Sequence, residues 1–98
     1  MMRSMKETIF HILVSIRTAN GLESIGRFYI GDNRDAAREI FRQLKGVPTV
    51  DDNTLLTLEL VETANDLPVN VDMIGNTLEE LSENCRVIVR ECFRLVNL

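Results

Sequence analysis

Hydrophobic and polar residues alternate along the first part of the chain, and this period of two is typical of a half-buried β-strand. The dipeptide Asn20-Gly21 follows the alternating stretch, and Asn-Gly is a strong signal for a hairpin turn. We therefore predict an antiparallel hairpin whose second strand ends near Ile30. The alternating hydrophobic positions of its first strand are Phe10, Ile12, Val14 and Ile16.

Two turns fit this hairpin, and they place the apolar residues differently. A two-residue loop over 20–21 would put Phe28 and Ile30 on the face opposite to the apolar residues of the first strand. A three-residue loop over 19–21, with Gly21 left-handed in a bulge, keeps both sets on one face. Because a shift of one residue turns every side chain to the other face of a sheet, we favour the three-residue loop. The pairs that it predicts are Phe10 with Ile30, Ile12 with Phe28 and Arg17 with Glu23.

A helical pattern follows Gly31. We predict Asp32 as the N-cap, since an Asp there accepts a hydrogen bond from the first turn. Asp35 adds negative charge near the positive end of the helix dipole. The helix is expected to end near Gly46, which is left-handed in many helix stops and here precedes Pro48. The apolar residues of this helix, spaced i, i+3, i+4, i+7, are Ala37, Ile40, Phe41 and Leu44.

A longer helix is predicted over residues 77–96. Thr77 and Glu80 match the capping box, in which each side chain satisfies the other residue's backbone amide. The apolar stripe of this helix contains both cysteines, Cys85 and Cys92. They lie seven positions apart, about 10.5 Å along the axis, which is too far for a disulfide. We predict that both are small core residues.

Alternating residues between the two helices predict two further strands, over 54–63 and 69–73. The order of elements is then ββαββα. We predict an α+β two-layer sandwich, with a four-stranded antiparallel sheet of order 2-1-3-4 and both helices, running parallel, on one face. Residues 1–98 are expected to form a single domain in which residues 1–4 are a loose tail.

The two halves of the chain resemble each other. One interpretation is the duplication of a ββα unit, with repeats over 6–46 and 53–98. The other is that turns recruit Asn and Gly independently, and the sequence leaves both open. The matching segments are RTANGL at 17–22 with ETANDL at 62–67, and IGDN at 30–33 with IGNT at 74–77.

The chain is acidic, with a formal charge of −4 at pH 7 and a pI near 4.9. Nucleic acids and anionic membranes need a basic surface, so we expect neither as a partner. No segment approaches the ~20 apolar residues of a membrane helix. The two cysteines, and an N-terminal segment without the small-residue cleavage site of an export signal, favour a reducing compartment. We predict a cytoplasmic protein.

Recognisable catalytic and metal-binding motifs are missing from the sequence. Gly31 is a single glycine without a following Lys-Ser or Lys-Thr, and Asp32 and Asp35 already occupy the helix terminus where a phosphate would bind. His11, the single histidine, has no cysteine or carboxylate at ligand spacing. We therefore predict no catalytic residue, no metal ligand and no cofactor.

Six of the nine arginines form two rows along the predicted helices, each with i, i+4, i+8 spacing. One interpretation is a basic track for an acidic partner. The other, which we favour, is a solvated flank whose charges are balanced by acidic residues three positions earlier. The rows are Arg34, Arg38 and Arg42, and Arg86, Arg90 and Arg94; the acidic residues are Asp35, Glu39, Glu83 and Glu91.

The sheet face that the helices leave open is the strongest candidate for function. A small protein seldom exposes many apolar groups on a bare sheet without a partner. We predict a non-enzymatic interaction module that forms a homodimer, or a complex with another protein, through this face or a sheet edge. The alternative is a small-ligand-binding protein or enzyme with a site at His11, Arg27, Tyr29 and Glu59. The predicted interface residues are Leu13, Ile25, Tyr29, Leu55 and Val61.

Overall fold

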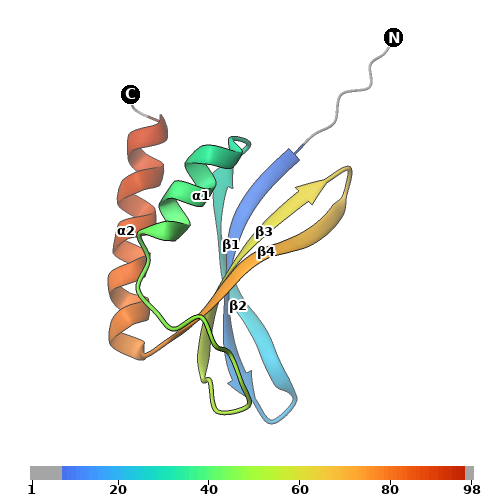
Figure 1. Ribbon diagram of the computed structural model, residues 1–98, viewed down its shortest axis with the longest axis vertical. Helices are drawn as coiled ribbons and strands as arrows, with labels where there is room; N and C mark the ends of the chain where they lie inside the picture. Colours follow the sequence, from blue (N-terminus) through green and yellow to red (C-terminus); the bar gives the residue numbers. More distant parts are fainter. Residues whose placement is uncertain (1–7, 97–98) are drawn as a thin grey trace.

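The computed structural model describes residues 8–96, so the expected tail at residues 1–4 lies outside the described residues. The strands form one antiparallel sheet of order β2-β1-β3-β4, with both helices on one side of it (Figure 1). This is the predicted ββαββα sandwich. Its elements are β1 (Thr8–Thr18), β2 (Gly21–Gly31), α1 (Arg34–Arg42), β3 (Leu56–Ala64), β4 (Leu67–Asn76) and α2 (Leu78–Val96).

The hydrophobic core lies between the sheet and the helices. Alternate residues of the two central strands β1 and β3 point toward the helices and are buried there. Each large apolar side chain removed from water contributes roughly 1.5–3 kcal/mol. This burial stabilises α1, which at nine residues is too short to persist alone. The core residues are Phe10, Ile12, Val14, Ile30, Leu58 and Leu60 from the sheet, with Ala37, Ile40, Phe41 and Ile88 from the helices.

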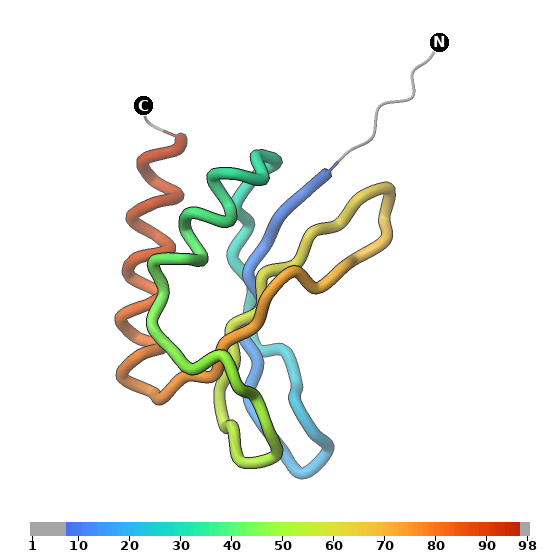
Figure 2. Tube along the Cα trace, viewed as in Figure 1, coloured from blue at the N-terminus to red at the C-terminus, as the bar shows by residue number. Residues whose placement is uncertain are grey.

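The two helices run in opposite directions, and the prediction that they run parallel was wrong (Figure 2). Each strand of the sheet is antiparallel to its neighbour. Because β2 and β4 are separated by two strands, they run in opposite directions. Each helix runs in the direction opposite to the strand that precedes it (Figure 2), so α1 and α2 also run in opposite directions.

The register of the first hairpin agrees with the prediction only in its middle. Ile12 pairs with Phe28 as expected. The turn, however, has two residues, Ala19 and Asn20, and Gly21 follows with a φ of 109°. The extra residue expected in the loop is instead Ile25, which lies in a bulge of β2. This bulge makes Arg17 pair with Leu22 and not with the predicted Glu23. A second irregularity, between Phe10 and His11, makes Phe10 pair with Gly31 and not with the predicted Ile30. Both predicted pairs were wrong.

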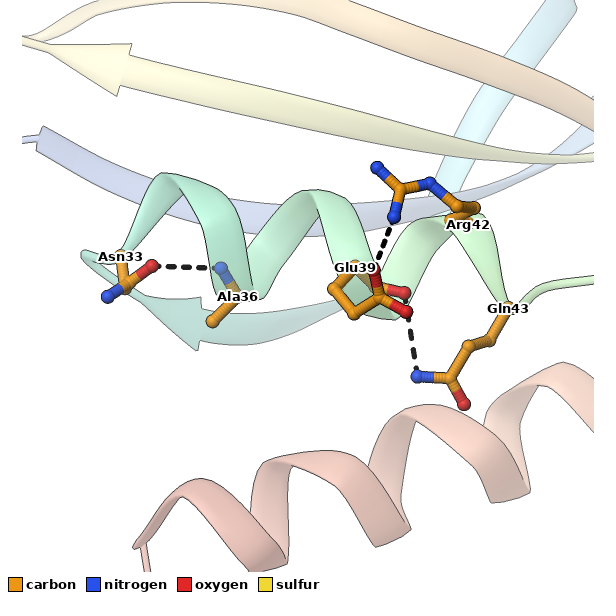
Figure 3. Close-up of polar contacts among 5 residues, drawn as sticks. All are labelled: Asn33, Ala36, Glu39, Arg42 and Gln43. Atoms are coloured by element: carbon orange, nitrogen blue, oxygen red, sulfur yellow. Dashed lines mark hydrogen bonds and ion pairs between the residues drawn. The ribbon is translucent and has the colours of Figure 1, made fainter.

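Both helix starts are capped, although the first cap differs from the predicted one. Asn33, not Asp32, is the N-cap of α1, and its Oδ1 accepts a hydrogen bond of 2.8 Å from the Ala36 amide (Figure 3). The capping box of α2 is confirmed. The Thr77 amide donates to Glu80 Oε1 at 2.9 Å, and the Glu80 amide donates to Thr77 Oγ1 at 3.1 Å.

The end of α1 was also predicted wrongly. The helix ends at Arg42, and Gln43, not Gly46, is its C-cap. Gly46 instead lies where the chain passes β4. A β-carbon at Gly46 would come within 2.6 Å of Asn76 Nδ2 and 2.7 Å of the Gly75 carbonyl oxygen. Close approach of the backbone therefore explains this glycine.

A buried amide cluster fixes the chain just after α1. Asn84 of α2 is fully buried. Its Oδ1 accepts from the Lys45 amide at 2.8 Å, and its Nδ2 donates to the Lys45 carbonyl at 2.7 Å and to Asn76 Oδ1 at 3.0 Å. Asn76 Nδ2 also donates to the Lys45 carbonyl, at 2.8 Å. The cluster joins α2, the end of β4 and the α1–β3 connection.

The two halves share their element order but not their turns. The β3–β4 turn consists of Asn65 and Asp66, both left-handed with φ of 54° and 68°. The β1–β2 turn, at 19–20, lies one position earlier in the matched sequence. The helix starts do correspond, since Asn33 and Thr77 are equivalent positions after a glycine and both cap a helix. The duplication stays a prediction.

Candidate interaction surface

The connection between α1 and β3 covers one end of the sheet face opposite to the helices. Val47 forms an antiparallel bridge with Gly75 at the edge of β4. Beyond it, Arg17 Nε donates to the Thr54 carbonyl and its NH2 group donates to the Asp51 carbonyl, both at 2.8 Å. A β-carbon at Gly75 would meet Thr54 Cγ2 at 2.9 Å. The segment 49–54 therefore lies across this end of the sheet (Figure 1).

The rest of that face is open, and two adjacent rows of cross-strand neighbours lie at its middle. We call these residues the open-face patch. The first row runs from β2 to β4 as Arg27, Leu13, Glu59 and Met73, and the second as Tyr29, His11, Val61 and Asn70.

The patch contains three of the five predicted interface residues. Val61 lies at its centre with only 4% of its surface exposed, Leu13 is half-buried, and Tyr29 is 63% exposed at the β2 edge. The other two lie elsewhere. Ile25 is exposed in the β2 bulge, and Leu55 precedes β3. Leu55 borders a separate hollow with Val47 and Leu78.

Glu59 is the unusual residue of the patch. Only 9% of its surface is exposed, yet its carboxylate has no hydrogen-bond or ion-pair partner among residues 8–96. Burial raises the pKa of Glu59 above its ordinary value, because removal from water disfavours the charged form. Buried carboxylates in folded proteins are normally paired.

His11 lies in the second row and is equally buried. Burial lowers its pKa, and the positive charge of Arg27 lowers the same pKa further. Both effects favour the neutral imidazole over the charged form. The described part of the chain contains no group of three or more metal-ligating side chains, and His11 hydrogen-bonds neither a nucleophile nor a carboxylate there.

A hollow of about 380 Å³ opens over part of the patch. It brings together two of the four predicted ligand residues, His11 and Arg27. The other two do not line it: Tyr29 is the cross-strand neighbour of His11, and Glu59 lies on the far side of Leu13 from Arg27. The lining residues are His11, Leu13, Arg27, Val61, Thr63, Asp66, Pro68 and Asn70.

The arginine rows are partly balanced by acidic residues. Arg42 pairs with Glu39 as predicted (Figure 3), and Arg94 lies 3.4 Å from Glu91. Arg34 instead reaches Glu62 on β3, at 2.6 Å. Arg38 and Arg86 form no ion pair within the described chain. Exposed pairs of this kind contribute about 0–1 kcal/mol each.

The cysteines are free thiols and both are half-buried. Cys92 packs against the core, but Cys85 does not belong to the core cluster, so the predicted core position is supported for Cys92 alone. Burial raises the pKa of the Cys85 thiol. Burial also raises the pKa of the Cys92 thiol, and the negative charge of Glu91 raises it further. A raised pKa keeps a thiol protonated and unreactive, so neither cysteine has the properties of a nucleophile.

Membrane-spanning helices are missing from residues 8–96: neither helix is long and apolar enough to cross a bilayer. Comparisons with protein-family models, with curated protein sequences and with solved structures find no match for this chain. The geometry of the open-face patch is therefore the basis for any functional argument.

Proposed function

We propose that the protein is a non-enzymatic interaction module whose open-face patch binds a second copy of the chain. The observation that carries this proposal is Glu59, a residue with 9% of its surface exposed, whose carboxylate has no partner within residues 8–96. A partner that covers the patch would bring a cation to Glu59 and apolar surface to the half-buried Leu13. The two free cysteines also suit the cytoplasm, where thiols stay reduced.

The sheet edges support association less well than the open face. At the β2 edge, two irregularities in the β1–β2 register interrupt the regular row of backbone groups that another strand would need. At the β4 edge, Pro68 lacks a backbone donor and Val47 already bridges Gly75. We therefore favour the face over an edge.

A charge placed in the patch tests this proposal. Tyr29 is exposed, so Tyr29→Glu leaves the fold intact while placing a carboxylate in the proposed interface. We expect sedimentation analysis to show association weakened at least tenfold, about 1.4 kcal/mol. The matched control is Val89→Glu, which puts the same charge at an exposed apolar position on α2. Unchanged association of Tyr29→Glu, or an equal loss in the control, would contradict the proposal.

A second candidate function, the binding of a small anionic ligand, is supported by the hollow that His11 and Arg27 line. Arg27 offers a guanidinium for a carboxylate or phosphate, and Leu13 and Val61 offer apolar walls. Thermal melting with millimolar acetate, citrate or inorganic phosphate tests this function. A rise in melting temperature that Arg27→Gln abolishes is expected; no rise with any of the three excludes these probes as ligands.

A further inference from the structure

We infer that the two copies pack face to face around a two-fold axis that lies between their sheets, parallel to β1 and above Leu13. Arg27 of each copy then meets Glu59 of the other. The inference rests on the proposed function and specifies how the same patch recognises its partner. It follows from the order of charges across the first row of the patch.

Arg27, Leu13 and Glu59 are direct cross-strand neighbours on three adjacent strands. Neighbouring strands lie about 4.8 Å apart, so Arg27 and Glu59 are separated by roughly 10 Å with Leu13 between them. The two charges form no ion pair within one chain. The row therefore presents a cation, an apolar residue and an anion in that order.

Such a row is complementary to itself under one kind of symmetry. A two-fold axis parallel to β1 reverses the order of strands across the interface, so the cation of each copy faces the anion of the other. A two-fold axis that also lies between the two sheets but runs perpendicular to the strands keeps the order of strands across the interface. Arg27 of one copy would then face Arg27 of the other. Since like charges brought together in an interface cost several kcal/mol, the charge order selects the axis along β1.

The second row is compatible with the same axis. Tyr29 of one copy would lie opposite Val61 of the other, so the exposed ring is placed over a buried apolar side chain and not over a charge. His11, next to the axis, would lie near its own equivalent, an arrangement that suits two neutral imidazoles. The stacked sheets would keep their β1 strands aligned, which is a common geometry for packed sheets.

Two charge reversals test the axis. Arg27→Glu leaves two acidic positions in each copy, and Glu59→Arg leaves two basic positions. In a homodimer of either variant, like charges meet twice, and we expect association at least about a hundredfold weaker than in the wild type. In a mixture of the two variants, both contacts join opposite charges. The heterodimer is expected to form within about tenfold of the wild-type affinity.

The outcomes separate the two proposals. If Tyr29→Glu abolishes the dimer but the mixture of charge variants fails to associate, the open face is the interface and the axis is wrong. If the wild type is monomeric, both proposals fail. Arg27 is exposed, so the Arg27→Glu variant is expected to fold. If this variant alone forms dimers with wild-type affinity, the inferred axis is also wrong.

A cross-linking measurement covers the case in which Glu59→Arg does not fold. On the proposed axis, Leu13 lies opposite its own equivalent. With Cys85→Ser and Cys92→Ser as background, Leu13→Cys is expected to give a covalent dimer with a short bis-maleimide. Glu79→Cys, at the exposed start of α2, is the control. Equal yields from the two positions would overturn any interface centred on Leu13, and the inferred axis with it.

Discussion

At the scale of single residues, the fold satisfies one buried polar side chain and leaves another unsatisfied. Asn84 makes three hydrogen bonds inside the described chain, whereas Glu59 makes none there. An unpaired buried carboxylate is costly in its charged form. In the proposed dimer, Glu59 is paired only when the second copy is present.

This account predicts opposite effects of Glu59→Gln on the monomer and on the dimer. Burial raises the pKa of Glu59, so the folded monomer binds this proton more tightly than the unfolded chain does. The stability contributed by the protonated form is complete below the ordinary pKa of about 4.5 and is lost as the pH rises toward the folded pKa. Gln mimics the neutral carboxyl group at every pH.

In the Tyr29→Glu background, which is expected to be monomeric, Glu59→Gln should therefore increase the free energy of unfolding at pH 7. The gain should disappear by pH 4. In the wild-type background the same substitution should weaken dimerisation. Urea titrations at both pH values measure the first effect, with exposed Glu83→Gln as the control. A loss of stability at pH 7 in the monomer would contradict the account.

At the scale of elements, the connection between α1 and β3 has two tasks. The amide cluster around Asn84 fixes its beginning against α2 and β4, and Arg17 fixes its end over the open face. These contacts set how far the segment 49–54 reaches across the sheet. They therefore define the boundary of the open-face patch.

The cluster predicts a large effect of Asn84→Leu. Leu has a similar size but leaves the Lys45 amide, the Lys45 carbonyl and Asn76 Oδ1 with fewer partners. An unsatisfied buried polar group costs about 1–3 kcal/mol, and we expect a loss of about 3 kcal/mol in the free energy of unfolding. Chemical denaturation measures it, with Ser82→Leu at an exposed position of the same helix as control. A loss below about 1 kcal/mol would show that the cluster contributes little.

The sequence predicts these elements well where the signal is local, and poorly where it depends on distant residues. The alternation of Phe10, Ile12 and Val14 and the capping box at Thr77 each report on a few neighbouring positions, and both predictions were confirmed. The bulge at Ile25 and the second irregularity between Phe10 and His11 have no local signature, so the predicted pairs of Arg17 and Phe10 were wrong. Asp32 and Asn33 are both good caps, and the sequence alone does not rank them.

The candidate site shows the same division. Leu13, Tyr29 and Val61 could be placed on one face because strand periodicity determines which way side chains point. The segment 49–54 could not be placed over that face, since the bonds from Arg17 and the contact at Gly75 join residues far apart in the chain. The burial of Glu59 likewise results from the assembled sheet and not from its neighbours in sequence.

At the scale of the whole molecule, each sheet face is covered differently. The helices cover one face, and the segment 49–54 covers one end of the other. The remaining part carries the self-complementary row of Arg27, Leu13 and Glu59. A second copy would cover it and pair both charges, whereas a small ligand in the hollow beside His11 would reach Arg27 but not Glu59.

The mass of the wild-type protein in solution tests the central claim most directly. A standard protein interface persists at tens of micromolar. Sedimentation equilibrium at that concentration and pH 7 should give a species of twice the 11.2 kDa chain mass, and dilution should dissociate it reversibly. A single species with the mass of one chain over the whole concentration range would contradict the claim that the open-face patch binds a second copy.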